Sequence, residues 1–235
     1  MCTLTYLLTD NGYELFFNRD ELRSRQVATA PALDNQLNAI YHVDPDGNGT
    51  WIAVHKSGLS LALLNFYQAG QAANNGEYLS RGQIILYLLE DPVNIIGRLK
   101  KMDLKEYLAF KLCIFAGDLS STKNKMRIFQ WDGKTLSEVA GTPPIISAGA
   151  EFPLISKIRK ARFAQIVSAE KPIREQFLTY HNFQETNPHF SVKMVRPEAY
   201  TVSFSHIVVG KKIEFHYVDY IGEQRYCCRM ARLPG

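Results

Sequence analysis

A cysteine stands directly behind the initiator methionine, in the opening stretch MCTLTY. Methionine aminopeptidases generally remove an initiator Met that precedes a small residue, so Met1-Cys2 predicts a mature chain that begins with Cys2. An α-amine has a reference pKa near ~8 and a thiol near ~8.5, so the two groups can exchange a proton close to neutral pH. One residue then supplies both nucleophile and base for acyl transfer. The alternative is a small, apolar cysteine that simply packs in the core.

Four polar residues follow in the stretch FFNRDE: Asn18, Arg19, Asp20 and Glu21. The strand-like stretches CTLTYLLT and YELFFN flank Asn11-Gly12, which predicts a hairpin with these two residues as its loop. Counting back in that register pairs Thr5 with Asn18, Leu4 with Arg19, Thr3 with Asp20 and Cys2 with Glu21. The tetrad is therefore expected beside the N-terminus. Arg19 falls on the face of Cys2 and Asp20 on the other face, so a bulge is needed to turn both toward the thiol.

These side chains suit a thiol nucleophile. Arg19 can stabilise a thiolate or a substrate carboxylate, and Asp20 can hold the N-terminal ammonium. From composition alone, an exposed hairpin end with an internal ion pair is the commoner case. Asn65 ends the nearly apolar stretch GLSLALLNF, where an amide is either a turn former or an oxyanion donor. Both alternatives stay open for Asn65.

Alternation and helical spacing predict the elements that must position these residues. After the hairpin we expect strands at 36–43, 50–57 and 59–66, helices at 77–91 and 93–102, strands at 110–118, 125–133 and 135–141, helices at 154–170 and 172–183, and strands at 201–210 and 211–220 that turn near Gly210. Groups of strands alternate with groups of helices, which indicates helices layered on antiparallel sheets, an α+β fold. No linker or repeat interrupts the chain, so residues 1–235 are expected to form a single domain.

The composition excludes several classes of protein. The net charge is +4, with scattered basic residues, which argues against a nucleic-acid partner. The four cysteines lack C-x-x-C spacing, which favours a reducing compartment. The first twenty residues lack the basic run followed by an apolar run that is typical of a signal peptide. We therefore expect a cytoplasmic protein. No apolar stretch is long enough to span a membrane. The six histidines have no metal-ligand spacing, and the expected chemistry uses neither a metal nor another cofactor.

Several stretches, in their order along the chain, resemble the NRDE family, also called the transport and Golgi organisation protein 2 family. They are MCTLTY, FFNRDE, NGTWIAVHKSGLSLALLNF, EYLSRGQIILYLL and RPEAYTVSFSHIVV. The most specific elements are Cys2, the tetrad itself, and the G-T-W strand that is followed by Gly, an apolar strand and Asn65.

That family is similar in turn to N-terminal nucleophile hydrolases of the choloylglycine hydrolase and penicillin V acylase type, which cleave non-peptide amide bonds. The resemblance implies a four-layer αββα sandwich of two antiparallel sheets between helix layers. It implies Cys2 as the nucleophile after removal of Met1, Arg19 and Asp20 as its neighbours, and Asn65 as the oxyanion donor. The second oxyanion position of these hydrolases falls near Ser147, and Asn18 and Glu21 complete the expected supporting shell.

The same resemblance carries a second interpretation. Members of the family have been linked to Golgi organisation and to haem or lipid handling, so the fold can have kept a binding pocket without turnover. The expected partner is thus a small molecule, either an amide substrate or a haem or lipid ligand. Haem binding needs an axial His, Cys or Tyr beside an apolar slot. No single motif among the six histidines marks such a site.

Overall fold

The computed structural model describes residues 2–69 and 78–233. The strands are β1 (Cys2–Thr9), β2 (Gly12–Leu22), β3 (Ala32–Asp34), β4 (Ala39–Tyr41), β5 (Ile52–His55), β6 (Ser60–Asn65), β7 (Phe110–Phe115), β8 (Arg127–Trp131), β9 (Leu136–Val139), β10 (Ile145–Ser147), β11 (Ala199–Val209), β12 (Lys212–Asp219) and β13 (Gln224–Ala231). The α-helices are α1 (Gly82–Leu89), α2 (Ile95–Lys101), α3 (Phe152–Ile166) and α4 (Arg174–His181), and short 3₁₀ helices lie at Tyr67–Ala69 and Leu104–Glu106.

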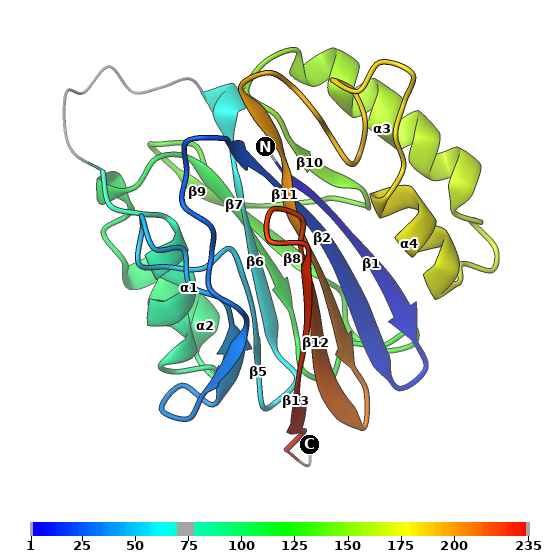
Figure 1. Ribbon diagram of the computed structural model, residues 1–235. Helices are drawn as coiled ribbons and strands as arrows, with labels where there is room; N and C mark the ends of the chain where they lie inside the picture. Colours follow the sequence, from blue (N-terminus) through cyan, green and yellow to red (C-terminus); the bar gives the residue numbers. More distant parts are fainter. Residues whose placement is uncertain (1, 70–77, 234–235) are drawn as a thin grey trace.

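The strands form two antiparallel sheets that pack face to face (Figure 1). Sheet A has the order β10-β1-β2-β11-β12-β13, and sheet B has the order β3-β4-β5-β6-β7-β8-β9. Helices α1 and α2 cover the outer face of sheet B, whereas α3 and α4 lie over β1 and β2 of sheet A. The molecule is therefore an αββα sandwich, which confirms the fold class predicted from the sequence.

Three buried apolar clusters hold the layers together. The largest lies between the sheets and includes Leu15, Phe17 and Phe115. A second joins sheet B to α1 and α2, and a third joins sheet A to α3 and α4, where Phe16 stacks on Phe177 with ring centroids 5.0 Å apart. Side chains alternate between the two faces of a strand, so a strand buried on both faces is apolar at nearly every position. The first six residues of β2, GYELFF, follow this rule apart from Glu14.

The elements differ from the predicted ones mainly at their ends. The helix expected at 77–91 begins only at Gly82, because Leu79 pairs with Tyr107 in an isolated parallel bridge; residue 77 lies outside the described residues. The strands β3, β10 and β13 were not predicted, and β3 has only three residues. β10 has three residues, and β13 is an edge strand whose exposed face carries Arg225, Cys227 and Arg229, so neither shows a clear apolar pattern.

The predicted register of the first hairpin was wrong by two residues. Thr9 pairs with Gly12, so Asp10 and Asn11 form the loop and Gly12 is the first residue of β2. Gly12 has φ of 152°, and a Cβ atom there would collide with the carbonyl oxygen of Val209 in β11. Gly12 is therefore needed because the backbone of β11 passes close to it, and not because the turn requires a glycine.

A buried histidine fastens the end of α4 to sheet A. Asn18 uses its Nδ2 atom to donate to the carbonyls of His181 and Val192, at 2.8 and 3.0 Å, so its Oδ1 atom is left to accept from His181 Nδ1 at 3.1 Å. His181 Nε2 then accepts from the Thr5 hydroxyl at 2.8 Å. A neutral imidazole satisfies both contacts, and burial lowers the pKa of His181 well below its usual range.

Among residues 2–69 and 78–233, no helix combines the length and apolar content that crossing a bilayer requires.

We predict that stability falls as the pH drops below ~6.5, because unfolding lets the buried imidazoles take up protons. Burial also lowers the pKa of His42, to about 3. Each of the two histidines contributes a slope of about 1.4 kcal/mol per pH unit between its unfolded and folded pKa values. In urea unfolding between pH 5 and 7, His181→Gln should reduce the slope, whereas His189→Gln, at an exposed position, should keep it. Equal slopes in all three proteins would contradict this prediction.

Candidate active site

Cys2 lies in the middle of a sheet rather than at its edge. It pairs with Arg19 of β2 on one side and with Ser147 of β10 on the other. Its side chain is half-buried and packs against the apolar cluster between the sheets. Two neighbouring strands therefore fix the position of the thiol.

A cavity of about 420 Å³ opens beside Cys2. Its walls come from β1, β2 and β6, from the loop at 44–51, and from the segment 78–83 that leads into α1. The last two segments touch through glycines: Thr50 N donates to the Gly82 carbonyl at 3.1 Å, and a Cβ atom on Gly82 would lie only 2.8 Å from Thr50 N. Close backbone packing of these loops thus shapes the cavity wall.

Arg19 reaches the cavity from the strand position directly opposite Cys2. Its guanidinium contacts Glu21 Oε2 and Asp44 Oδ2, each at 3.1 Å, and lies 3.9 Å from the ring centroid of Trp51. Arg25 shares Asp44 at 2.7 Å. The carboxylates and the aromatic ring hold Arg19 in one orientation, next to the thiol.

The electrostatics of the thiol follow from this arrangement. Burial raises the pKa of the Cys2 thiol, and the carboxylates of Asp20 and Glu21 raise it further, while the positive charge of Arg19 opposes the rise. A buried thiol without a neighbouring cation would remain protonated at neutral pH. Arg19 is therefore the described side chain that favours the thiolate.

Asp20 borders the cavity, but its carboxylate points to the helix layer. It accepts from the Thr201 hydroxyl at 2.6 Å and pairs with Arg159 of α3 at 3.4 Å. Arg159, which is fully buried, also donates to the Thr3 hydroxyl at 2.5 Å. No bulge in the pairing of β1 with β2 turns Asp20 toward the thiol; the register shift lies in β11, between Thr201 and Ser203.

Asn65 borders the cavity together with Cys2, at the end of β6 in the opposite sheet. Its Nδ2 atom donates to the Tyr67 hydroxyl at 2.8 Å, which uses one of the two N–H bonds of the amide. Its backbone carbonyl accepts from the Ser147 hydroxyl at 2.6 Å. Ser147, which pairs with Cys2 across the sheet, thus links the two sheets.

The structure brings Cys2, Arg19, Glu21 and Asn65 to one cavity, with Asp20 at its border. Asn18 lies on the opposite face of β2, bonded to His181, and Ser147 pairs with Cys2 on β10 but does not border the cavity. Removal of Met1 concerns a residue outside the described part of the chain.

Sequence reasoning missed several side chains of the site. Asp44 lies in the turn DPDGNG, where acidic residues are common without any function. Arg81 also lines the cavity, and it donates to the Ala109 carbonyl at 3.1 Å. Within the described residues, no carboxylate lies within 4 Å of Arg81. Arg81 lies inside the helix predicted at 77–91, where a single basic residue does not stand out from a solvated helix position.

Comparisons with known proteins agree with this architecture. The family described as Transport and Golgi organisation 2 matches residues 1–229. The mouse and human Transport and Golgi organisation 2 homologues are each 27% identical to the chain over 121 residues, which is 49% of the chain and 43% of the relative. The alignment thus spans less than half the length of these curated relatives.

Solved structures that share the fold include two hydrolases. One is the C2A mutant of a conjugated bile acid hydrolase from Clostridium perfringens, with a TM-score of 0.56 and 14% identity, covering 98% of this chain and 92% of that one. The other is a Caenorhabditis elegans orthologue of N-acylethanolamine-hydrolyzing acid amidase, with a TM-score of 0.57 and 10% identity, covering 89% and 93%. Both are N-terminal nucleophile hydrolases with the αββα sandwich.

We predict that Arg159→Met destabilises the protein by about 3–5 kcal/mol, because it removes the cation that faces the buried Asp20 carboxylate. The double variant Asp20→Asn/Arg159→Met should lose less stability than the sum of the two single changes, since it removes both charges together. Denaturant unfolding measures all three variants. Strictly additive losses would contradict a direct coupling between the two side chains.

We also predict that Arg19→Gln raises the pKa of the Cys2 thiol further, because it removes the opposing cation. The rate of Cys2 alkylation by iodoacetamide, followed by peptide mass spectrometry across a pH series, measures this shift. Arg25→Gln is the matched control, since Arg25 contacts the same carboxylates, Glu21 and Asp44. Identical pH profiles for the wild type and Arg19→Gln would rule out the role assigned to Arg19.

Proposed function

The chain belongs to the Transport and Golgi organisation 2 family, and we propose that it is a cysteine hydrolase that cleaves a non-peptide amide bond through an acyl-enzyme. One observation carries the proposal: Cys2 lies opposite Arg19 at a cavity that Asn65 borders from the other sheet. The cavity then has a nucleophile in Cys2, a positive charge in Arg19 and an oxyanion donor in Asn65. The family membership and the fold support a hydrolase of this general type.

The proposed reaction begins after removal of Met1, which gives Cys2 a free α-amine. The amine takes the thiol proton, and the thiolate attacks the amide carbonyl carbon to form a tetrahedral oxyanion. Collapse of this intermediate breaks the C–N bond, and the leaving nitrogen receives the proton from the ammonium. The amine then takes a proton from water, the resulting hydroxide attacks the thioester, and the acid product leaves as the thiol is restored.

Two side chains support the charged species of this reaction. Asn65 has an N–H bond that Tyr67 does not use, and this bond is the proposed donor to the oxyanion. Arg19 lowers the free-energy cost of forming the thiolate at the start of each cycle, because its charge opposes the rise that burial causes in the pKa of Cys2. Arg81 offers a cation on the cavity wall for a polar or acidic group of the substrate.

In this proposal residues 1–235 act as one domain and the enzyme works in the cytoplasm. The four cysteines are free thiols in the structure, as a reducing compartment would keep them. The substrate is a small molecule, since the cavity volume of about 420 Å³ suits a compact acyl or amine group.

The alternative function is the binding of haem or lipid without turnover. Such ligands need a largely apolar slot. The walls of this cavity are instead rich in charge, with three arginines and several carboxylates: Arg19, Arg25, Arg81, Glu21, Asp44 and Asp46. This lining favours a polar substrate. If the activity test below fails, binding without turnover becomes the proposed function.

The test starts from the intact mass of the purified, untagged protein, which should lack Met1. A thiol-reactive acylating probe should label Cys2 first, and a panel of fluorogenic acyl amides should be hydrolysed. Cys2→Ala should lower the rate of hydrolysis by at least about 10³-fold, and Asn65→Ala should lower kcat by about 10²–10³-fold. Cys228→Ser, at a half-buried cysteine on β13 that does not border the cavity, is the matched control and should keep full activity.

Two results would overturn the proposal. One is a processed chain whose Cys2 stays inert toward the probe. The other is hydrolysis at the same rate in the wild type and in Cys2→Ala. In either case haem and lipid titrations of the same preparations become the next measurement.

A further inference from the structure

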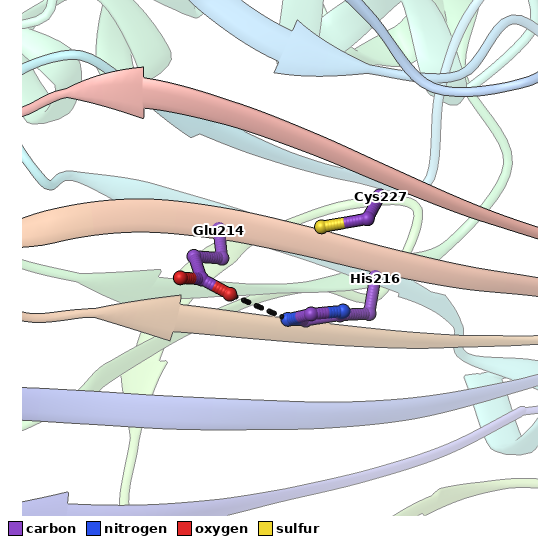
Figure 2. Close-up of side chains that lie close together, drawn as sticks. All are labelled: Glu214, His216 and Cys227. Carbon is purple, nitrogen blue, oxygen red and sulfur yellow. Dashed lines mark hydrogen bonds and ion pairs between the residues drawn. The ribbon is translucent and has the colours of Figure 1, made fainter.

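Three metal-ligating side chains converge on sheet A, away from the cavity. Glu214 and His216 belong to β12 and Cys227 belongs to β13 (Figure 2). One ligand atom from each of the three lies within 4.8 Å of the other two. None of the three residues borders the cavity beside Cys2.

The geometry of the sheet dictates this convergence. Residues two apart on a strand share a face, so Glu214 and His216 point the same way. In the antiparallel register His216 pairs directly with Cys227, which therefore points to that face as well. The intervening residue Phe215 and the neighbouring Cys228 pack into the cluster between the sheets. The backbone that carries the three ligands is thus held by the core behind it.

The donor set is specific in its chemistry. An imidazole nitrogen, a thiolate sulfur and a carboxylate oxygen are the three donor types found in zinc sites, with bond lengths of about 2.0–2.3 Å. His216 Nε2 and Glu214 Oε2 already lie 2.9 Å apart, so one ion can contact both after a small adjustment. Hard cations such as Mg²⁺ and Ca²⁺ prefer sites made of oxygen ligands alone, so a site with a thiol ligand suits them poorly.

The surroundings of the cluster are compatible with a cation. The ring of His206 stacks on His216 with centroids 5.5 Å apart, and His206 is itself held by Glu14 at 2.7 Å. This stack fixes the plane of the His216 ring. Arg229 is the competing cation, since its Nε atom lies 3.5 Å from Glu214. Its side chain is largely exposed and can move into solvent when an ion binds.

We propose that Glu214, His216 and Cys227 form a zinc-binding site on the outer face of sheet A. Binding replaces the His216–Glu214 contact with two bonds to the ion, and the Cys227 thiol releases its proton to solvent as its sulfur bonds to the metal. Water completes the coordination. The ion would join β12 to the edge strand β13, so the expected consequence is a more stable C-terminal edge of the sheet.

The test uses untagged protein with Cys2→Ala, which removes the N-terminal thiol as a competing ligand. Zn²⁺ is titrated against a chromogenic chelator, and Co²⁺ is used as a spectroscopic probe. We expect one ion per chain, a thiolate-to-cobalt charge-transfer band, and a higher Tm with Zn²⁺. Cys227→Ser and His216→Gln should each weaken Zn²⁺ binding by at least about tenfold, and Cys227→Ser should abolish the band.

Cys228→Ser is the matched control, because the adjacent thiol packs against the core side of the same strand. It should bind Zn²⁺ and give the cobalt band as the parent does. Circular dichroism without metal checks that each variant is folded, and Glu214→Gln provides a third ligand change if His216→Gln fails this check. Three results would overturn the proposal: no stoichiometric uptake, uptake unchanged by Cys227→Ser, or equal losses in Cys227→Ser and Cys228→Ser.

Discussion

Arg19 and Asp20 are neighbours in the sequence, and both are buried. The alternation of a strand sends them to opposite faces of sheet A, so β2 carries a positive charge toward the cavity and a negative charge toward the helix layer. A buried charge is tolerated only with partners. Asp44 must therefore come from a loop of the other half of the sandwich, and Arg159 must come from α3.

The need of each buried charge for a partner fixes how the layers are placed against one another, which apolar packing alone does not specify. Asp44 brings the loop at 44–51 against Arg19, and the same loop forms a wall of the cavity. Arg159 brings α3 against Thr3 and Asp20, directly behind the strand that carries Cys2. The position of the thiol is thus fixed from both faces of its sheet, as a preorganised site requires.

The sequence allowed the outline of this site to be predicted because its key residues are local. The hairpin brings the tetrad beside Cys2 whichever of the two registers is used, and the family resemblance pointed to Asn65, which borders the same cavity. The remaining features depend on distant contacts. The place of Gly12 is set by β11, and Arg159 belongs to SKIRKAR, a stretch with four basic residues in which no single one stands out. Nothing in the spacing of that helix reveals that one arginine is fully buried against Asp20.

The order of the strands along the chain also determines when the site can fold during protein synthesis. Within the described residues, every residue that borders the cavity precedes position 109, yet β2 completes its sheet only by pairing with β11, which begins at Ala199. At ~5–20 residues per second of protein synthesis, the hairpin waits on the order of ten seconds for this neighbour. Such long-range pairings form late and slowly. A ribosome that stops before β11 therefore releases a chain with all the lining residues and an unfinished scaffold beneath them.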